Sequence, residues 1–97
     1  MSGQNQLKVN FYSKLREIAG QKTVEFPLQA GTTVQGLVEA VVLRYPLMQD
    51  LLFQEGGALN RNAHFFVNGR DVPFLENAQR TVVSKHDKVD LFPPGHF

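Results

Sequence analysis

One stretch of this chain has the pattern of a long amphipathic helix, and only short strand-like segments surround it. Its apolar residues recur at i, i+3, i+4, i+7 and i+11, the spacing of one helix face: Val34, Leu37, Val38, Val41 and Tyr45. Thr32 and Thr33 precede the stripe and suit an N-cap. Pro46 ends it, because the residue before a proline disfavours helical conformation. A single helix of this kind must bury its apolar face against another layer, and the flanking segments indicate a sheet.

Those flanking segments alternate apolar and polar residues, as strands with one buried face do. The expected strands cover residues 7–11, 23–26, 64–68 and 88–92, and we expect the first two to pair antiparallel. Asn68-Gly69 predicts a tight hairpin turn that leads into Arg70. Short helical pieces are expected at 13–20, capped by Ser13 and Gly20, and at 47–53.

The order of these elements predicts an α+β fold with a mixed sheet of four or five strands and one principal helix, the β-grasp (ubiquitin-like) outline. The chain has 97 residues, enough for one domain and one core. We expect a flexible N-terminus at 1–6, a single domain at 7–92 and a C-terminal tail at 93–97.

Composition excludes several kinds of chemistry. The chain has no cysteine, which excludes disulfides, thiolate chemistry and cysteine-ligated metals. Ten basic and nine acidic residues are scattered along it, so no basic patch for nucleic acid is expected. The apolar runs are far shorter than the roughly 20 residues of a membrane span, and the polar start indicates no signal peptide. We expect a cytoplasmic protein that binds neither nucleic acid nor membrane.

No arrangement of side chains predicts an enzyme. The three histidines, His64, His86 and His96, lack the spacing of a metal site, so no metal is expected. The serines have no partners for nucleophilic catalysis. Gly56-Gly57 lacks the context of a phosphate-binding loop.

Three aromatic residues, Tyr12, Phe66 and Phe92, occupy the phase opposite to the core residues of their strands. They are therefore expected to share the outer face of the sheet. Exposed aromatic clusters commonly bind a protein partner, and Arg70 and Arg80 would border such a site. The alternative is that loops, or the segment 47–62, cover these rings.

Four pieces of the chain, taken in order, resemble the MoaD/ThiS family of ubiquitin-like sulfur carrier proteins. They are the start through Leu15-Arg16-Glu17-Ile18-Ala19-Gly20, the helix start Gly31-Thr32-Thr33-Val34, the hairpin Val67-Asn68-Gly69, and the ending Asp87-Lys88-Val89 to Leu91-Phe92-Pro93-Pro94. The resemblance runs from Leu7 to Pro94. The long segment from Tyr45 to Ala63 is similar to the archaeal-type MoaD branch.

The resemblance implies that the protein is a carrier and not an enzyme. In this family an E1-like adenylating enzyme uses ATP to activate the carboxylate of a C-terminal glycine, which then becomes a thiocarboxylate. The sulfur goes to a molybdenum or tungsten pterin precursor on the large subunit of molybdopterin synthase, or to a thiazole precursor. The carrier itself binds no cofactor. Phe92, Phe66, Tyr12, Pro93, Pro94 and Arg70 would contact these partners.

The tail departs from the family pattern. Where the family finishes in Gly-Gly, this sequence has Gly95-His96-Phe97, so its terminal carboxylate belongs to Phe97. One hypothesis is that removal of His96-Phe97 exposes Gly95 as the acyl site. The alternative is a non-catalytic β-grasp binding module that has kept the docking face and lost the thiocarboxylate chemistry.

Overall fold

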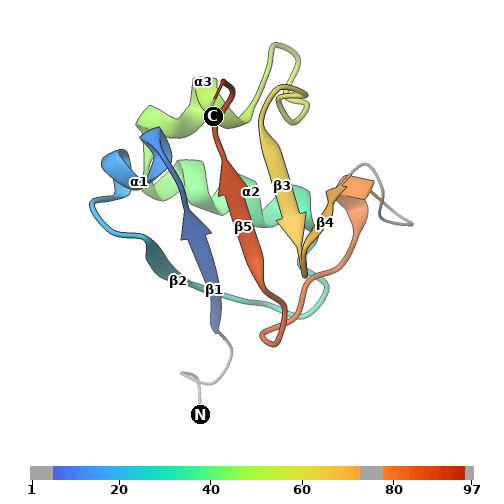
Figure 1. Cartoon of the computed structure of the whole chain (residues 1–97). Helices are drawn as coiled ribbons and strands as arrows, with labels where there is room; N and C mark the ends of the chain where they lie inside the picture. The colour runs from blue at the N-terminus through green and yellow to red at the C-terminus, as the bar shows by residue number, and fades with distance from the viewer. Residues whose placement is uncertain (1–5, 73–77, 96–97) are drawn as a thin grey trace.

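A five-stranded mixed sheet carries its principal helix on one face, as the computed structural model of residues 6–72 and 78–95 shows (Figure 1). The strands are β1 (Gln6–Phe11), β2 (Thr23–Pro27), β3 (His64–Val67), β4 (Arg70–Asp71) and β5 (Val89–Phe92), in the order β2-β1-β5-β3-β4. The helices are α1 (Lys14–Ala19), α2 (Val34–Arg44) and α3 (Gln49–Leu52), with 3₁₀ turns at Pro46–Met48 and Ala78–Arg80. The α+β prediction is confirmed.

The strand β5 lies at the centre of this sheet. It runs parallel to β1, with Val9 opposite Val89, and antiparallel to β3, with Phe65 opposite Leu91. The strands β1 and β2 form the antiparallel pair expected from the sequence. Both Val89 and Leu91 face the core, so the predicted phase of the last strand is confirmed.

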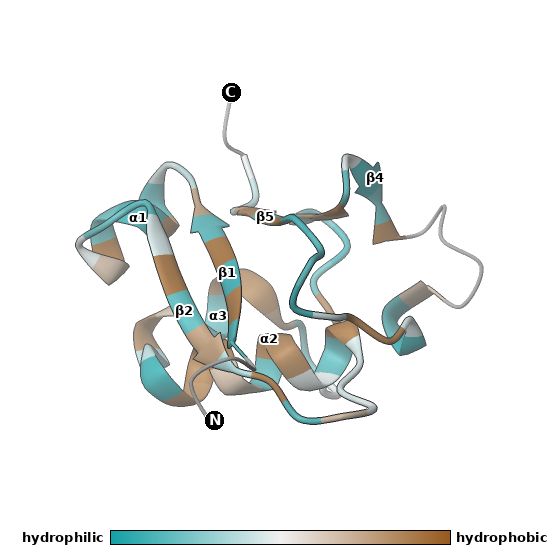
Figure 2. Ribbon diagram, turned by 90° about the horizontal axis from the view of Figure 1, so that it is seen from below, coloured by the Kyte–Doolittle hydropathy of each residue, from teal (hydrophilic) through white to brown (hydrophobic). Residues whose placement is uncertain are grey.

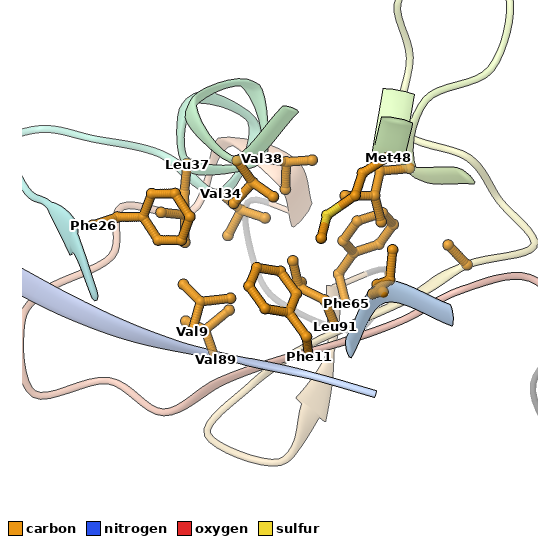
Figure 3. Packing of buried hydrophobic residues seen from close by; sticks show 14 of the residues in the cluster. Val9, Phe11, Phe26, Val34, Leu37, Val38, Met48, Phe65, Val89 and Leu91 are labelled. Carbon is orange, nitrogen blue, oxygen red and sulfur yellow. The ribbon is translucent and has the colours of Figure 1, made fainter. Parts of the chain in front are cut away.

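The core lies between α2 and the inner face of the sheet. Figure 3 shows Val34, Leu37 and Val38 of α2 directed at side chains of β1 and β5. The Phe11 ring fills the centre and meets Phe26 edge-on at 6.4 Å between centroids. The helical stripe is therefore buried, as its period predicts. Valine has a low intrinsic helix propensity, so packing against the sheet must stabilise this helix.

The predicted ends of α2 are confirmed. The Thr33 hydroxyl accepts a hydrogen bond from the Gly36 backbone N–H at 3.1 Å, and Arg44 is the last helical residue before Tyr45 and Pro46. The cap of α1 is different. Ser13 has φ 55° and makes no capping hydrogen bond through its side chain, so that part of the prediction is wrong. A capping side chain reaches the first-turn N–H groups from an extended backbone, which Ser13 does not adopt.

The hairpin turn at Asn68-Gly69 ties three strands together. Both residues have positive φ, 55° and 82°, as a tight hairpin requires. The Asn68 side chain accepts a hydrogen bond from the Lys88 N–H at 2.9 Å and donates one to Asp87 at 3.0 Å. The turn between β3 and β4 therefore also holds the start of β5. Within the described ranges, no helix is long and apolar enough to cross a membrane.

We expect the Thr33→Ala variant to lose about 1 kcal/mol of unfolding free energy, because the Gly36 N–H at the start of α2 would lose its acceptor. Denaturant unfolding measures this loss. Thr33→Ser keeps the hydroxyl and should stay close to the wild type. Equal stability of the alanine and serine variants would show that the cap contributes nothing.

Candidate functional site

The face of the sheet opposite to α2 contains the candidate site. In Figure 1, α2 lies behind the strands, and this outer face is turned toward the viewer. Figure 2 shows hydrophilic and hydrophobic bands alternating along β1 and β2, as expected where one face is buried and the other is not. The outward residues of β1, β5 and β3 thus form a surface independent of the core.

An aromatic cluster occupies this outer face, made of Tyr12, Phe92, Phe66 and His64. The Tyr12 and Phe92 rings stack at 4.3 Å between centroids with 9° between their planes. Phe66 meets Phe92 edge-on at 5.6 Å, and His64 stacks on Phe66 at 6.1 Å. All four side chains are half-buried, so neighbouring segments do not cover them completely. The expectation that the three predicted aromatic residues share one surface is confirmed.

His64 belongs to the cluster although the sequence analysis gave it no role there. It lies two residues before Phe66 on the same strand and opposite Phe92 in register, so period-2 alternation could have placed it on this face. Its Nδ1 atom lies 3.2 Å from the Asp71 carboxylate. The pair closes the cluster on the β4 side.

Arg70 does not border the cluster. It pairs in register with Val67, whose side chain faces the core, whereas Asp71 pairs with the outward Phe66. Because directly opposed residues share one face, the outward position on β4 belongs to Asp71. The register thus places Asp71, and not Arg70, opposite Phe66, whereas a contact of the exposed Arg70 with a partner stays a prediction. Arg80 is exposed in the 3₁₀ turn at Ala78–Arg80.

A hydrogen-bond network runs beside the rings and was not predicted. Asp90, on the outer face of β5, is only 7% exposed. Its Oδ1 atom accepts hydrogen bonds from Asn10 Nδ2 at 2.9 Å and from the Tyr12 hydroxyl at 3.0 Å. Thr23 Oγ1 donates to Asn10 Oδ1 at 2.7 Å and so fixes the orientation of that amide. The network holds Tyr12 in place against Phe92.

Burial raises the pKa of the Tyr12 hydroxyl above its ordinary value, and the hydrogen bond to Asp90 and the negative charge of that carboxylate raise it further. All three causes favour the neutral phenol, which donates to Asp90. Lys22 Nζ lies 5.3 Å from the centroid of the same ring. Tyr12 is therefore held by a carboxylate at its hydroxyl and stacked on Phe92, with a cation over its ring.

The tail leaves the sheet directly beside the aromatic cluster. Phe92 is the last residue of β5, Pro93 is buried, and Pro94 is half-buried. Gly95 is exposed and has φ 70°, a conformation that favours glycine. His96 and Phe97, the two residues of the trimming hypothesis, lie outside the described residues. Gly95 is thus the first exposed residue after the sheet.

In the described part of the chain, no three histidine, aspartate or glutamate side chains gather in a way that could hold a metal ion. The arrangement offers a surface with aromatic anchors and a short peptide that emerges from its edge. Such a surface suits docking, with the chemistry supplied by a partner.

Comparison with known sequences identifies the family. Residues 9–95 match the ThiS family. The chain belongs to this family of ubiquitin-like sulfur carriers. The match begins within β1 and includes Asn10, Tyr12, the outward residues of β3 and β5, and Gly95, so it covers the residues of the candidate site.

Individual relatives agree with this assignment. The chain is 26% identical over 89 residues to small archaeal modifier protein 3 of Haloferax volcanii, covering 92% of this chain and 95% of that protein. A putative molybdopterin converting factor, subunit 1, from Pyrococcus furiosus is 28% identical, with a TM-score of 0.73 over 93% of this chain and 98% of that one. The crystal structure of SAMP1 from Haloferax volcanii has a TM-score of 0.81 at 24% identity, covering 95% and 98% of the two chains. The β-grasp fold is confirmed.

We expect Tyr12 to ionise at higher pH in the folded protein than in the unfolded chain. Its contribution to stability is then complete below the unfolded pKa of about 10, and is lost as the pH rises through the folded pKa. A Tyr45→Phe background leaves Tyr12 as the only tyrosine, so tyrosinate absorbance reports on it alone. Adding Asp90→Asn should lower the folded pKa. An unchanged pKa of Tyr12 in the Asp90→Asn variant would contradict the role of Asp90.

Proposed function

We propose that this protein is a sulfur carrier of the MoaD type, which acts in molybdenum or tungsten pterin cofactor synthesis with its acyl group at Gly95. Family membership over residues 9–95 carries the proposal, and the similarity to the Pyrococcus furiosus subunit supports this pathway. The carrier performs no catalysis itself. Its partners are an E1-like adenylating enzyme and a protein that resembles the large subunit of molybdopterin synthase.

The chemistry requires a free carboxylate on Gly95. His96 and Phe97 follow it in the sequence, so the bond between Gly95 and His96 must first be hydrolysed. The partner enzyme then joins the carboxylate to AMP from ATP, releasing pyrophosphate. A sulfur donor displaces AMP and leaves a thiocarboxylate. Glycine suits this step because it has no side chain to hinder a narrow active site.

Because the tail is short, the partner enzyme must dock close to the sheet before it can react with Gly95. Pro93 is buried and Pro94 half-buried, so little of the chain before Gly95 is free to extend. Two residues span about 7 Å at most. The active site of the partner must therefore come close to Phe92, and the aromatic cluster is the surface nearest to it. We infer that Phe92, Phe66 and Tyr12 form the contact that brings the enzyme to Gly95.

A second function of the same acyl group is protein modification. The relative from Haloferax volcanii is a small archaeal modifier protein. In that case an amine, such as a lysine side chain of a target, would attack the activated Gly95 carbonyl and form an isopeptide bond. Both functions require the same cleavage and activation, and they differ only in the nucleophile that follows.

We expect mass spectrometry of the protein from its native cells to find a chain that ends at Gly95. In the presence of the E1-like enzyme, ATP and a sulfur source, its mass should rise by the difference between sulfur and oxygen. A Gly95→Ala variant should not gain sulfur. Gly56→Ala, at another exposed glycine with positive φ, should behave as the wild type.

The result of this mass spectrometry distinguishes the sulfur carrier, the protein modifier and the binding module. A chain that keeps His96 and Phe97 under all conditions would overturn the carrier and favour the binding module. A branched peptide that joins Gly95 to a lysine of another protein would favour the modifier.

We expect Phe92→Ala to weaken binding to the E1-like enzyme of the same host by about 1–2 kcal/mol or more, the scale of an interface hot spot. The variant removes the ring that stacks on Tyr12 and meets Phe66. Leu43→Ala is the matched control, because Leu43 is 84% exposed on α2, behind the sheet. Calorimetric titration measures both, after thermal unfolding has shown that each variant is folded. Unchanged affinity of Phe92→Ala would remove this residue from the interface.

A further inference from the structure

Asp90 is the one charged residue that is buried within the described ranges, and it lies on the outer face, away from the core. Its neighbours in register are Asn10 on β1 and Phe66 on β3. A carboxylate that is 7% exposed loses most of its hydration. Such a group normally needs a cation or several hydrogen-bond donors around it.

The two carboxylate oxygens of Asp90 differ in the number of hydrogen bonds that they accept. Both of its donors, Asn10 Nδ2 and the Tyr12 hydroxyl, bind the same oxygen, Oδ1. Within the described residues Oδ2 has no donor. Among the described residues, Thr81 Oγ1 is the only fully buried polar side-chain atom without a hydrogen-bond partner. Because Oδ2 of Asp90 also has no donor there, it is not fully buried and must contact solvent. The unused oxygen is therefore a small acceptor that opens on the outer face.

Among the described residues, no cation forms an ion pair with this carboxylate. In the described residues the ion pairs are Lys14 with Glu17 and His64 with Asp71, and neither involves Asp90. The nearby Lys22 ammonium lies over the Tyr12 ring. Both groups that bind Asp90 are neutral, an amide and a phenol. The negative charge of Asp90 is left for an external cation.

We propose that Oδ2 of Asp90 binds the guanidinium group of an arginine from the protein partner that docks on the aromatic cluster. The inference rests on the proposed function for the identity of that partner. Charge complementarity requires a cation, and the neighbouring rings of Tyr12, Phe92 and Phe66 favour one that is planar. A guanidinium stacks on aromatic faces while its N–H groups donate at the edge, and it is less strongly hydrated than an ammonium.

The contact between Asp90 and a guanidinium would add specificity to an otherwise apolar surface. The rings supply apolar area, which binds many partners, whereas a largely desolvated carboxylate rejects any partner that does not present a cation. Tyr12 and Asn10 hold Oδ1, so the carboxylate is already oriented before the partner arrives. Asp90 is thus a specificity-determining residue, with no part in the acyl chemistry.

The test compares Asp90→Asn with Glu25→Gln in binding to the E1-like enzyme of the same host. Asparagine keeps an oxygen for Asn10 and Tyr12 and replaces Oδ2 by an amide nitrogen, which repels a guanidinium. We expect its affinity to fall about tenfold or more and its binding to depend less on salt. Glu25→Gln removes the same charge from an exposed residue of β2, and should stay within about twofold of the wild type. Equal affinity of Asp90→Asn and the wild type would overturn the proposal.

A second measurement needs no variant and no enzyme. Arginine amide is titrated into the wild-type protein and followed by NMR, with citrulline amide, whose side chain is an uncharged ureido group, as the control. We expect arginine alone to shift the amide signals of Asn10, Asp90 and Phe92. Equal shifts with both compounds would overturn the arginine site. Failure of the wild type to bind the enzyme, together with arginine-specific shifts, would count against the proposed partner and leave the site standing.

Discussion

Burial of the apolar stripe of α2 against one face of the sheet is the constraint on which the rest of the molecule depends. The described residues include a single long helix, and its buried residues belong to the core, with Val34, Leu37 and Val38 directed at the sheet. One helix covers one face of a sheet, so the opposite face must be stabilised by its own side chains. The aromatic stack and the Asp90 network do this by packing rings and polar groups against one another. The candidate site therefore exists because the principal helix covers only one of the two faces of the sheet.

The central strand, β5, links the core to the site. Its alternate residues serve both layers: Val89 and Leu91 fill the core, while Asp90 and Phe92 belong to the outer face. It pairs with β1 on one side and β3 on the other, and therefore fixes the separation of Tyr12 from Phe66. A shift of one residue in its register would exchange the two sets and place a carboxylate in the core. The same alternation that builds the core thus determines which residues make up the candidate site.

Local patterns predicted the parts of this structure that depend on neighbours in sequence. The stripe from Val34 to Tyr45, its Thr33 cap and the Asn68-Gly69 turn could all be predicted, because each depends on residues a few positions apart. Features that depend on strand order could not. Asn10 and Asp90 are 80 residues apart, and they meet only because β1 and β5 are parallel neighbours. The position of Arg70 depends on the register of a two-residue strand, which the sequence does not specify. The failure of Ser13 to cap α1 follows from its backbone dihedral angle, which cannot be read from the residue type.

The burial of Pro93 limits how far Gly95 can extend from the sheet. A carrier with a long flexible tail can serve an active site at the end of a tunnel, because its folded body can stay outside. Here the peptide is anchored at its root, and Gly95 lies two residues further on. If Gly95 carries the acyl group, as proposed, the catalytic centre of a partner must come within about 7 Å of Pro93, close to the ring of Phe92. The buried Pro93 would then limit how far the reacting carbonyl can enter a partner, and would favour a shallow active site over a deep one.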